Sequence, residues 1–405
     1  MLGGIDRLVG LFTHSKSSPK TDLRIVSGYT FFDPDAPTHR KAQDTLKAEL
    51  IQTGLKKSAF DYLVSPSTKP LLTQTHEATG RQSNLMSIRL PTVVSHGSHQ
   101  IGIVPIRSSA DLHTLRNGRP EAFRNVDYAI VFSFLDRLST RRLVRDSDWI
   151  DIAVIHQNAR ERSSLAPVGS GFLMEAGDRG RYLAKVTIHN PSLGRPLQYT
   201  APKVSLPVNP LFKNPITAIS LPPSRTENAR LTFELVPLDS QIHAAPSFSK
   251  SIARYTQTLK TLYASQSRAG SPIDQPTSPY AGVNSCEDCH PDAVQFWSTT
   301  RHAHAWRTLD NLDKTFDAEC VECHVTGWQE PGGTSIGFVS ELENVQCEVC
   351  HGPSRSHAAS GGDAALLTHR YDEPQCKACH NEHHSPRFSY PEYRSRIIGT
   401  GHGGP

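Results

Sequence analysis

The 405-residue sequence predicts two modules, a layered α/β domain followed by a small, mainly helical and loop-rich domain. Three observations indicate this division. Short apolar runs alternate with helical patterns over the first 245 residues. All eight Cys lie after residue 285. The formal charge is +12 over residues 1–284 (34 basic, 22 acidic groups) and −8 over residues 285–405 (9 basic, 17 acidic groups), which also favours two modules.

The front module, residues 1–245, contains apolar runs of strand length. Such runs suit strands that are buried on both faces of a largely parallel sheet. We expect strands at 22–32, 60–66, 100–106, 126–134, 149–157, 171–177, 181–190 and 231–238. The pattern also predicts helices at 39–53, with Gly54 as the stop signal, and at 138–146. Together these elements indicate an α/β layered domain.

Residues 246–284 connect the two modules. An amphipathic helix is expected at about 249–266, with one apolar face formed by Ile252, Tyr255, Leu259 and Leu262. Residues 267–284 are rich in Gly, Pro and Ser, which is typical of a linker. The second module then occupies residues 285–405.

The eight cysteines form four copies of the motif Cys-x-x-Cys-His. This motif is the attachment signature of c-type haem: the two thiols form thioethers to the haem, and the His binds the iron as proximal ligand. The thioether cysteines are Cys286, Cys289, Cys320, Cys323, Cys347, Cys350, Cys376 and Cys379, and the proximal ligands are His290, His324, His351 and His380. The sequence therefore predicts four covalently bound haem c groups.

Two other uses of paired cysteines are less consistent with this pattern. Four-thiolate zinc sites do not require a His after every second Cys. Disulfides need no fixed triplet either. Four haems in a module of this length leave little room for an ordinary core, so the haems must lie close together and supply much of the buried apolar material. Closely spaced haems form an electron path.

Seven further histidines in the second module are candidates for the distal iron ligands. An iron with two His ligands suits electron transfer, whereas an open sixth position can bind a small molecule. The candidates are His302, His357, His402, His304, His369, His383 and His384. His302 follows His290 by 12 residues on what reads as one helix, so we expect it to serve a different haem from that of His290.

Several classes of function are disfavoured. No apolar run is long enough for a transmembrane helix. The basic residues of the front module are scattered, without interleaved aromatic residues, which argues against nucleic-acid binding. We expect an electron-transfer protein that acts with redox partner proteins. The alternatives are a haem-based reductase of a small nitrogen or sulfur oxyanion, a subunit of a self-assembling extracellular haem filament, and a phosphoesterase with a redox appendage.

The second module resembles the tetrahaem cytochrome c family whose best-known member takes electrons from hydroxylamine oxidoreductase. The resemblance rests on CEDCHPDAVQFWSTTRHAHAW, CVECHVTGW followed by PGG, NVQCEVCHGPSRSH and CKACHNEHHSP. It implies haems packed in close pairs and mostly bis-His irons. It also implies that the haem of Cys320, Cys323 and His324 lacks a sixth protein ligand. His302 matches the family's distal His in the T-x-H-A segment, and His357 follows the HGP turn at a different distance.

The front module resembles the metallophosphoesterase domain of the periplasmic 5′-nucleotidase family. The resemblance rests on GGIDRLVGLF, SGYTFF, LPTVVSHGSHQIGIVPI, VDYAIVFSFLD, IDIAVIHQN and EAGDRGRYLAKVTI, over about residues 1–190. The two-metal chemistry of that family needs Asp, Asn and His ligands. Tyr29, Phe134 and Asn158 stand at ligand positions, and Asn-His-Glu is reduced to Thr75-His76-Glu77. Only His156 remains, so we expect the domain to be degenerate and inactive as a hydrolase.

Covalent haem attachment takes place outside the cytoplasm, so the protein is expected to be exported to the periplasm or the cell exterior. The first 20 residues contain no basic segment followed by an apolar segment, as a signal peptide would. The resemblance of the front module also begins after the family's expected first strand. We therefore expect a natural precursor with a signal peptide and that strand.

Overall fold

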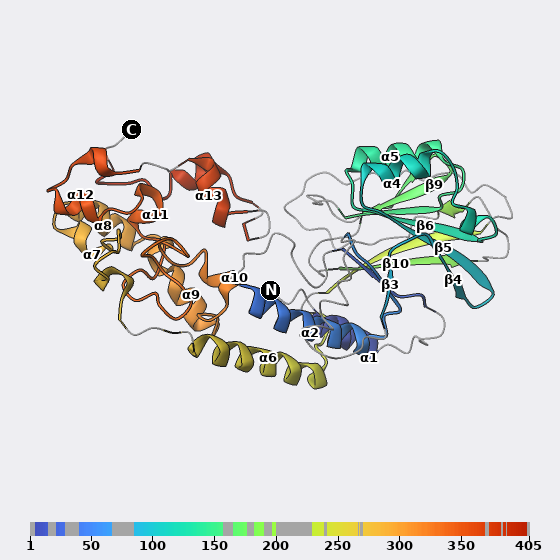
Figure 1. Ribbon diagram of the computed structural model, residues 1–405, viewed down its shortest axis with the longest axis horizontal. Coiled ribbons are helices and arrows are strands. Elements are labelled where there is room, and N and C mark those ends of the chain that lie inside the picture. The colour runs from blue at the N-terminus through green and yellow to red at the C-terminus, as the bar shows by residue number, and fades with distance from the viewer. Residues whose placement is uncertain are drawn as a thin grey trace. The chain divides into compact units, whose positions relative to one another are not determined.

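In the computed structural model of the protein, the described residues are 5–14, 22–28, 40–66, 85–156, 165–175, 182–189, 197–199, 229–238, 241–265, 267, 270–368, 372–381, 384–385 and 387–402. The chain divides into two compact units, Met1–Ala253 and Arg254–Pro405. The division falls within helix α6, Pro246–Ala264. Figure 1 gives the labels of the elements along the chain.

Unit 1 contains three sheets. The largest has six strands in the order β4-β5-β6-β7-β9-β8, and two three-stranded sheets have the orders β1-β2-β3 and β10-β12-β11. The strands are β1 Ile25–Ser27, β2 Tyr62–Val64, β3 Met86–Ile88, β4 Thr92–His96, β5 His99–Ile106, β6 Tyr128–Ser133, β7 Ile152–Ile155, β8 Leu165–Val168, β9 Gly171–Glu175, β10 Tyr182–His189, β11 Gln198–Tyr199 and β12 Arg230–Pro237. The helices are α1 Ile5–His14, α2 Lys41–Lys57, α4 Ser109–Arg116, η2 Glu121–Phe123 and α5 Arg137–Asp146.

The six-stranded sheet is buried on both faces, which explains the continuous apolar runs. Helices α4 and α5 cover one face, as Figure 1 shows, and their Leu112 and Leu143 pack there with Val131 of β6. The opposite face packs against the two smaller sheets, where Phe132 of β6 shares a core with Leu231 of β12. Side chains alternate between the faces along each strand. The predicted α/β layered class is confirmed.

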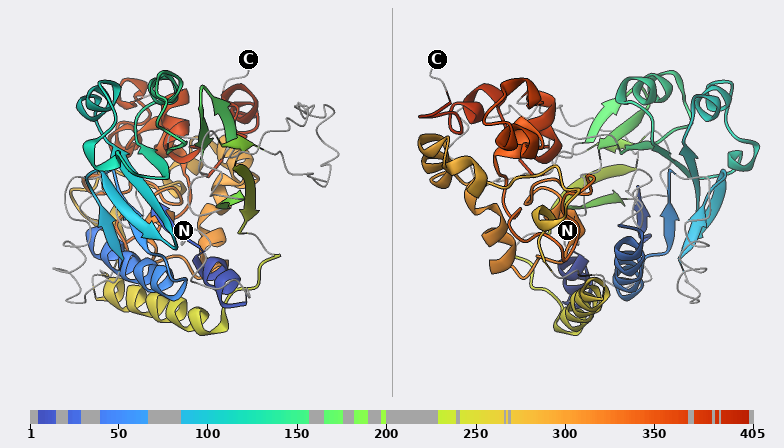
Figure 2. Two further views of the ribbon diagram at one scale, coloured as in Figure 1. Left: turned by 90° about the vertical axis from the view of Figure 1, so that its right-hand side faces the viewer. Right: turned by 60° about the vertical axis from the view of Figure 1, so that its left-hand side comes forward.

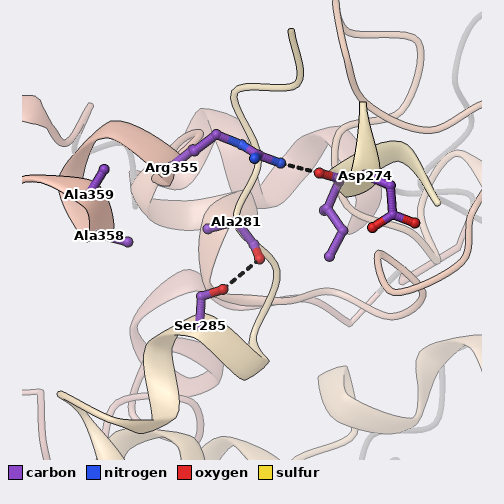
Figure 3. Close-up of a pocket in the computed structure, with 7 residues that line it drawn as sticks. Asp274, Ala281, Ser285, Arg355, Ala358 and Ala359 are labelled. Atoms are coloured by element: carbon purple, nitrogen blue, oxygen red, sulfur yellow. Dashed lines mark hydrogen bonds between the residues drawn. The ribbon is translucent and has the colours of Figure 1, made fainter. Parts of the chain in front are cut away.

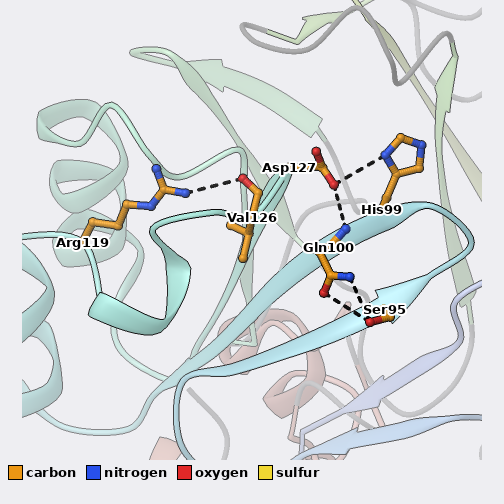
Figure 4. A network of polar contacts seen from close by, with 6 residues as sticks. All are labelled: Ser95, His99, Gln100, Arg119, Val126 and Asp127. Atoms are coloured by element: carbon orange, nitrogen blue, oxygen red, sulfur yellow. Dashed lines mark hydrogen bonds and ion pairs between the residues drawn. The ribbon is translucent and has the colours of Figure 1, made fainter.

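Mixed strand direction distinguishes the large sheet from the parallel sheet that the apolar runs predict. Strands β5, β6, β7 and β9 are parallel, but β4 and β8 pair antiparallel with β5 and β9. The edge strands β4 and β8 are short, and each forms a hairpin with its neighbour, β5 or β9. Gly97 and Gly169 lie in the two turns at positive φ. The Asp127 carboxylate anchors the β4–β5 hairpin by accepting from the Gln100 N–H at 2.7 Å (Figure 4).

Gly54 does not stop its helix, contrary to the sequence prediction. Helix α2 continues to Lys57, and Gly54 is buried inside it. A Cβ atom on Gly54 would lie 2.4 Å from Ile5 Cγ1 and 3.1 Å from Phe248 Cζ. The glycine is therefore a packing residue that lets neighbouring elements approach α2 closely.

Unit 2 consists of short helices joined by long turns, as Figure 2 shows for residues 270–402. Its elements are η4 Pro272–Asp274, α7 Asn284–Glu287, α8 Pro291–Ser298, η5 His302–His304, α9 Ala305–Asn311, α10 Ala318–Val321, α11 Cys347–His351, α12 Arg355–Ala359, η6 Ala364–Leu366, α13 Glu373–Cys379 and α14 Tyr390–Arg394. This agrees with the predicted helical, loop-rich module. None of the helices in the described part of the chain has the length and apolar character to cross a membrane.

Buried apolar side chains are unevenly distributed in unit 2. Residues such as Tyr280, Leu309, Phe316 and Leu342 form a core near the second Cys-x-x-Cys-His motif. Among the described residues from 343 to 402, by contrast, no apolar side chain is buried. That stretch contains two of the four motifs, so its own side chains supply almost no core.

Candidate functional site

Each Cys-x-x-Cys-His motif folds as a helical turn. The second Cys of the first two motifs donates its backbone N–H to the first Cys, from Cys289 to Cys286 and from Cys323 to Cys320, at 3.3 Å in both. The histidine N–H of the first and fourth motifs closes a longer turn onto the first Cys, at 2.8 Å. Side chains three positions apart share a face of a helical turn. Both thiols of a motif thus point the same way, as attachment to one flat group requires.

Backbone carbonyls orient two of the imidazole rings. His324 Nδ1 lies 2.6 Å from the Ala305 carbonyl oxygen, and His357 Nδ1 lies 2.9 Å from that of Asp363. An Nδ1–H that donates to a carbonyl leaves Nε2 as the lone-pair nitrogen, which is the usual second-shell arrangement of a metal-binding His. Both rings are therefore set to present Nε2 to a metal.

The structure brings four histidines together as two pairs. The ring centres of His290 and His357 are 6.4 Å apart with planes 18° from parallel, and those of His302 and His380 are 6.1 Å apart. An imidazole nitrogen binds a first-row metal at about 2 Å and the ring centre lies about 1 Å behind it, so two imidazoles across one iron have centres about 6 Å apart. Both spacings match that value.

Burial affects the protonation of the second pair. It lowers the pKa of His302, with a further contribution from the nearby His380, and it also lowers the pKa of His380. Neutral imidazole is the form that binds a metal. The flat face of Phe388 packs on the His380 ring at 4.8 Å with planes 12° apart, and so fixes the orientation of that ring.

The motifs contact one another in the order first, third, fourth, second, and Gln375 Nε2 beside the fourth motif donates to the Val349 carbonyl of the third. The thiols of Cys286 and Cys347 lie close enough to shift each other's pKa, as do those of Cys323 and Cys379. The neighbouring thiol raises the pKa of Cys286 and Cys323 and lowers the pKa of Cys347 and Cys379. Burial raises the pKa of Cys320 to about 12 and that of Cys350 to about 11. The first motif thus lies beside the third, and the second beside the fourth.

Two polar residues that the sequence analysis missed tie the third motif to the first. The buried Glu348 carboxylate accepts from the N–H groups of Ala281, Gly282 and Ser354 at 2.7–2.9 Å. Gln346 accepts from the Val283 N–H at 2.8 Å. Both flank Cys347, and in the sequence polar residues at these positions indicate only an ordinary surface. Nothing in the local sequence distinguishes Glu348 from Glu287 at the same place in the first motif.

A pocket of about 330 Å³ lies beside the first motif and α12 (Figure 3). Arg355 crosses it and donates from Nε to the Tyr280 carbonyl at 3.1 Å and from Nη2 to the Ile273 carbonyl. Ser285, Ala358 and Ala359 complete part of the lining. Residues 270–284, which read as linker in the sequence, therefore line a site next to His357.

The remaining distal candidates lie elsewhere. His402 is exposed, and its ring lies nearly perpendicular to that of Phe296, with the ring centres 6.3 Å apart. His304 is exposed on η5, and the backbone N–H of His384 donates to Asn381. His369 and His383 fall outside the described residues.

In unit 1, two of the expected ligand positions, Phe134 and His156, lie together at one edge of the six-stranded sheet. His156 follows β7, its Nε2 hydrogen bonds to Ser27 Oγ at the end of β1, and its ring stacks on Phe134 at 4.7 Å. Burial lowers the pKa of His156 to about 4. Tyr29, Asn158 and Thr75–Glu77 lie outside the described residues. Within the described ranges, no group of three or more His, Cys, Asp or Glu could hold a metal ion.

The side chains of unit 2 fit covalent haem. Each motif is a helical turn with two thiols on one side, and two imidazole rings are held through Nδ1. Two pairs of rings have the spacing expected across one iron, and the described residues from 343 onward contribute no buried apolar side chain. These features define a multihaem c-type cytochrome module. Residues 285–352 match the family "Cytochrome c554 and c-prime". This match implies covalently bound c-type haem and supports an electron carrier.

A curated relative, cytochrome c-554 of Nitrosomonas europaea, is 33% identical over 136 residues, which cover 25% of this chain and 58% of the relative. The chain thus spans little more than half of that relative's length. The solved reduced cytochrome c554 from the same organism is 28% identical over 30% of this chain and 79% of its own, with a TM-score of 0.23. The family match and the curated relative confirm the resemblance that the motifs indicated.

A 5′-nucleotidase precursor from Thermus thermophilus is among the similar solved structures. It is 11% identical over 64% of this chain and 54% of its own, with a TM-score of 0.39. Likeness of this degree says nothing about the chemistry of unit 1.

Proposed function

We propose that the protein is an exported electron carrier that holds four covalent haems in residues 285–405. The observation that carries this is the occurrence of four Cys-x-x-Cys-His turns with two pairs of facing imidazoles. Bound haem supplies an iron that takes up and releases one electron at a time. The chain supplies the thioether cysteines, the axial imidazoles and the close spacing of the motifs.

The ring pairs support a specific assignment of ligands. His290 and His357 would bind the first haem iron, and His380 and His302 the fourth. His302 thus serves a different haem from that of the motif nearest to it in sequence. The contacts between thiols support placing the first haem beside the third and the second beside the fourth.

The test uses the full chain matured in a host with the c-type haem machinery. Mass spectrometry should find four haem additions, and the reduced-minus-oxidised spectrum should be that of c-type haem. His357→Ala should convert one haem of four from low-spin to high-spin, as seen by electron paramagnetic resonance. His304→Ala is the matched control and should leave the spectrum unchanged. A colourless, zinc-loaded protein would contradict the proposal.

We further propose that unit 1 has a docking or assembly role without phosphoesterase activity. Phe134 places an apolar ring against His156 at the sheet edge where metal ligands would be needed. Without metals, no water is activated at neutral pH. Hydrolysis of nucleoside monophosphates and an aryl phosphate should stay at background with added manganese or zinc. Turnover that His156→Ala abolishes would refute this role.

A further inference from the structure

A shallow, positively charged pocket lies on η5 and α9 of unit 2. It has a volume of about 340 Å³ and is lined by Thr299, Thr300, Arg301, His304, Arg307 and Thr308. Arg301, His304 and Arg307 are exposed, and no carboxylate lines the pocket. Within the described part of the chain, no ion pair engages either arginine. The three hydroxyl groups donate to backbone carbonyls, so the cationic groups are what an incoming ligand meets.

This charge contrasts with that of the surrounding module. Residues 285–405 carry 9 basic and 17 acidic groups. An acidic protein approaching the module would be repelled over most of its surface, because like charges raise the energy of encounter. The pocket presents two exposed arginines with no carboxylate in its lining, so it favours contact with an acidic surface at this point.

The same segment reaches two of the haem positions. His302, next to Arg301, lies 6.1 Å from the His380 ring. Ala305, next to His304, accepts the hydrogen bond from His324 Nδ1 at 2.6 Å. A partner bound at Arg301 thus contacts the chain neighbour of His302, a proposed ligand of the fourth haem. A partner bound at His304 contacts the chain neighbour of Ala305, whose carbonyl orients His324 of the second motif. Electron transfer falls steeply with distance, so docking must occur near such positions.

We propose that this pocket is the docking site for the acidic surface of a redox partner protein. The proposal rests on the proposed function and names the kind of partner and its place of contact. Transient electron-transfer complexes bury little area, so a few exposed cationic groups suffice to orient them. Their strength should depend on ionic strength, because the Debye length falls from about 30 Å at 0.01 M to about 8 Å at 0.15 M.

The test measures binding instead of electron flow. The probe is oxidised plant-type [2Fe–2S] ferredoxin, an acidic protein, titrated by calorimetry and NMR line broadening against the oxidised haem-loaded protein. At 0.01 M salt, the double variant Arg301→Gln/Arg307→Gln should weaken binding by on the order of tenfold. Arg394→Gln, an exposed arginine on α14, is the matched control and should have little effect. Raising the salt to 0.15 M should remove the difference.

The outcomes separate the two proposals. Each variant is first checked for an unchanged haem spectrum and circular dichroism. A normal haem spectrum with equal ferredoxin affinity in the double variant and the parent overturns the docking site alone. A starting protein without the haem spectrum overturns the proposed function as well. Loss of affinity in the Arg394→Gln control as large as in the double variant shows diffuse charge attraction, and also overturns the site.

Discussion

Glu348, in the module of residues 285–405, has a buried carboxylate that accepts hydrogen bonds from backbone N–H groups of two segments. Its buried carboxylate satisfies three backbone N–H groups that come from the segment before the first motif and from the turn after the third. A carboxylate can accept all three, whereas an amide has only one oxygen acceptor. Hydrogen bonds to a charged group contribute about 1.5–3 kcal/mol each, and an unsatisfied buried donor carries its own penalty.

Glu348→Gln should therefore lower the free energy of unfolding of the haem module by about 2–3 kcal/mol. The measurement is denaturant unfolding followed by the Soret band. Glu287→Gln is an internal control, because Glu287 has the same position in the first motif but is exposed. Equal stability of the two variants would show that the carboxylate contributes nothing specific.

His156 should make unit 1 sensitive to acid. Its pKa is about 4 in the folded state because of burial against Phe134 and Phe132, and it is ordinarily about 6.5 when exposed. The unfolded chain therefore binds the proton first as pH falls. The stabilising difference is fully present above about pH 7 and is lost between about pH 6.5 and pH 4, by about 2–3 kcal/mol.

The fluorescence of Trp149 measures this effect, because Trp149 is buried in unit 1 and the other three Trp lie in unit 2. His156→Gln should flatten the decline in stability between pH 6.5 and pH 4. His113→Gln, at an exposed position on α4, should leave the decline as it is. An unchanged pH profile in His156→Gln would contradict the assignment.

At the scale of elements, α2 shows tertiary packing overriding a local signal. Gly54 has the features of a helix stop, yet Ile5 of α1 and Phe248 of α6 press on it within the helix. Intrinsic propensity alone makes Ala better than Gly in a helix by about 1 kcal/mol. The contact distances predict instead that Ala at position 54 lowers the free energy of unfolding.

Gly54→Ala should thus destabilise unit 1 by about 1–3 kcal/mol through overpacking. The double variant Gly54→Ala/Ile5→Ala should recover part of the loss, because the nearest atoms of the clash are those of Ile5. Thermal unfolding followed by Trp149 gives both values. A more stable Gly54→Ala protein would mean that helix propensity dominates at this position.

How far the sequence predicts the elements depends on whether the signal is local. The buried strands β5, β6 and β7 and the helix α5 follow from apolar runs and caps, because burial on both faces leaves a continuous pattern. The edge strands β4 and β8 are short and half-exposed, and their antiparallel pairing depends on turns rather than on hydrophobicity. Likewise, the Cys-x-x-Cys-His motifs can be recognised in the sequence. The second imidazole that faces each proximal His cannot, because the paired residues lie more than 60 positions apart.

For the whole molecule, the coordination of the second haem iron separates an electron carrier from an enzyme that also reduces a substrate. In the part of the chain that the structure describes, no second imidazole lies against His324, the proximal residue of the second motif. An iron there with an open sixth position would bind carbon monoxide when reduced. A haem-based reductase is the second candidate function, and it requires such an iron.

If the protein is such a reductase, the reduced form should bind carbon monoxide at the second haem, seen as a Soret shift of about one quarter of the haem absorbance. His324→Ala should remove this response, and His402→Ala should not. Four haems that all resist carbon monoxide would exclude the reductase and leave a pure electron carrier.

The two imidazole pairs have a topological consequence. His290–His357 and His302–His380 join residues 67 and 78 positions apart, and the second span begins inside the first and ends beyond it. Two shared irons would close loops that overlap in sequence, each restricting the unfolded chain as a disulfide of similar length does, by about 4 kcal/mol. In an exported chain, as proposed above, neither loop could close before His357 had crossed the membrane. The segment from the first motif onward would then stay accessible to proteases and chaperones until late in export, and would become compact only when both loops close.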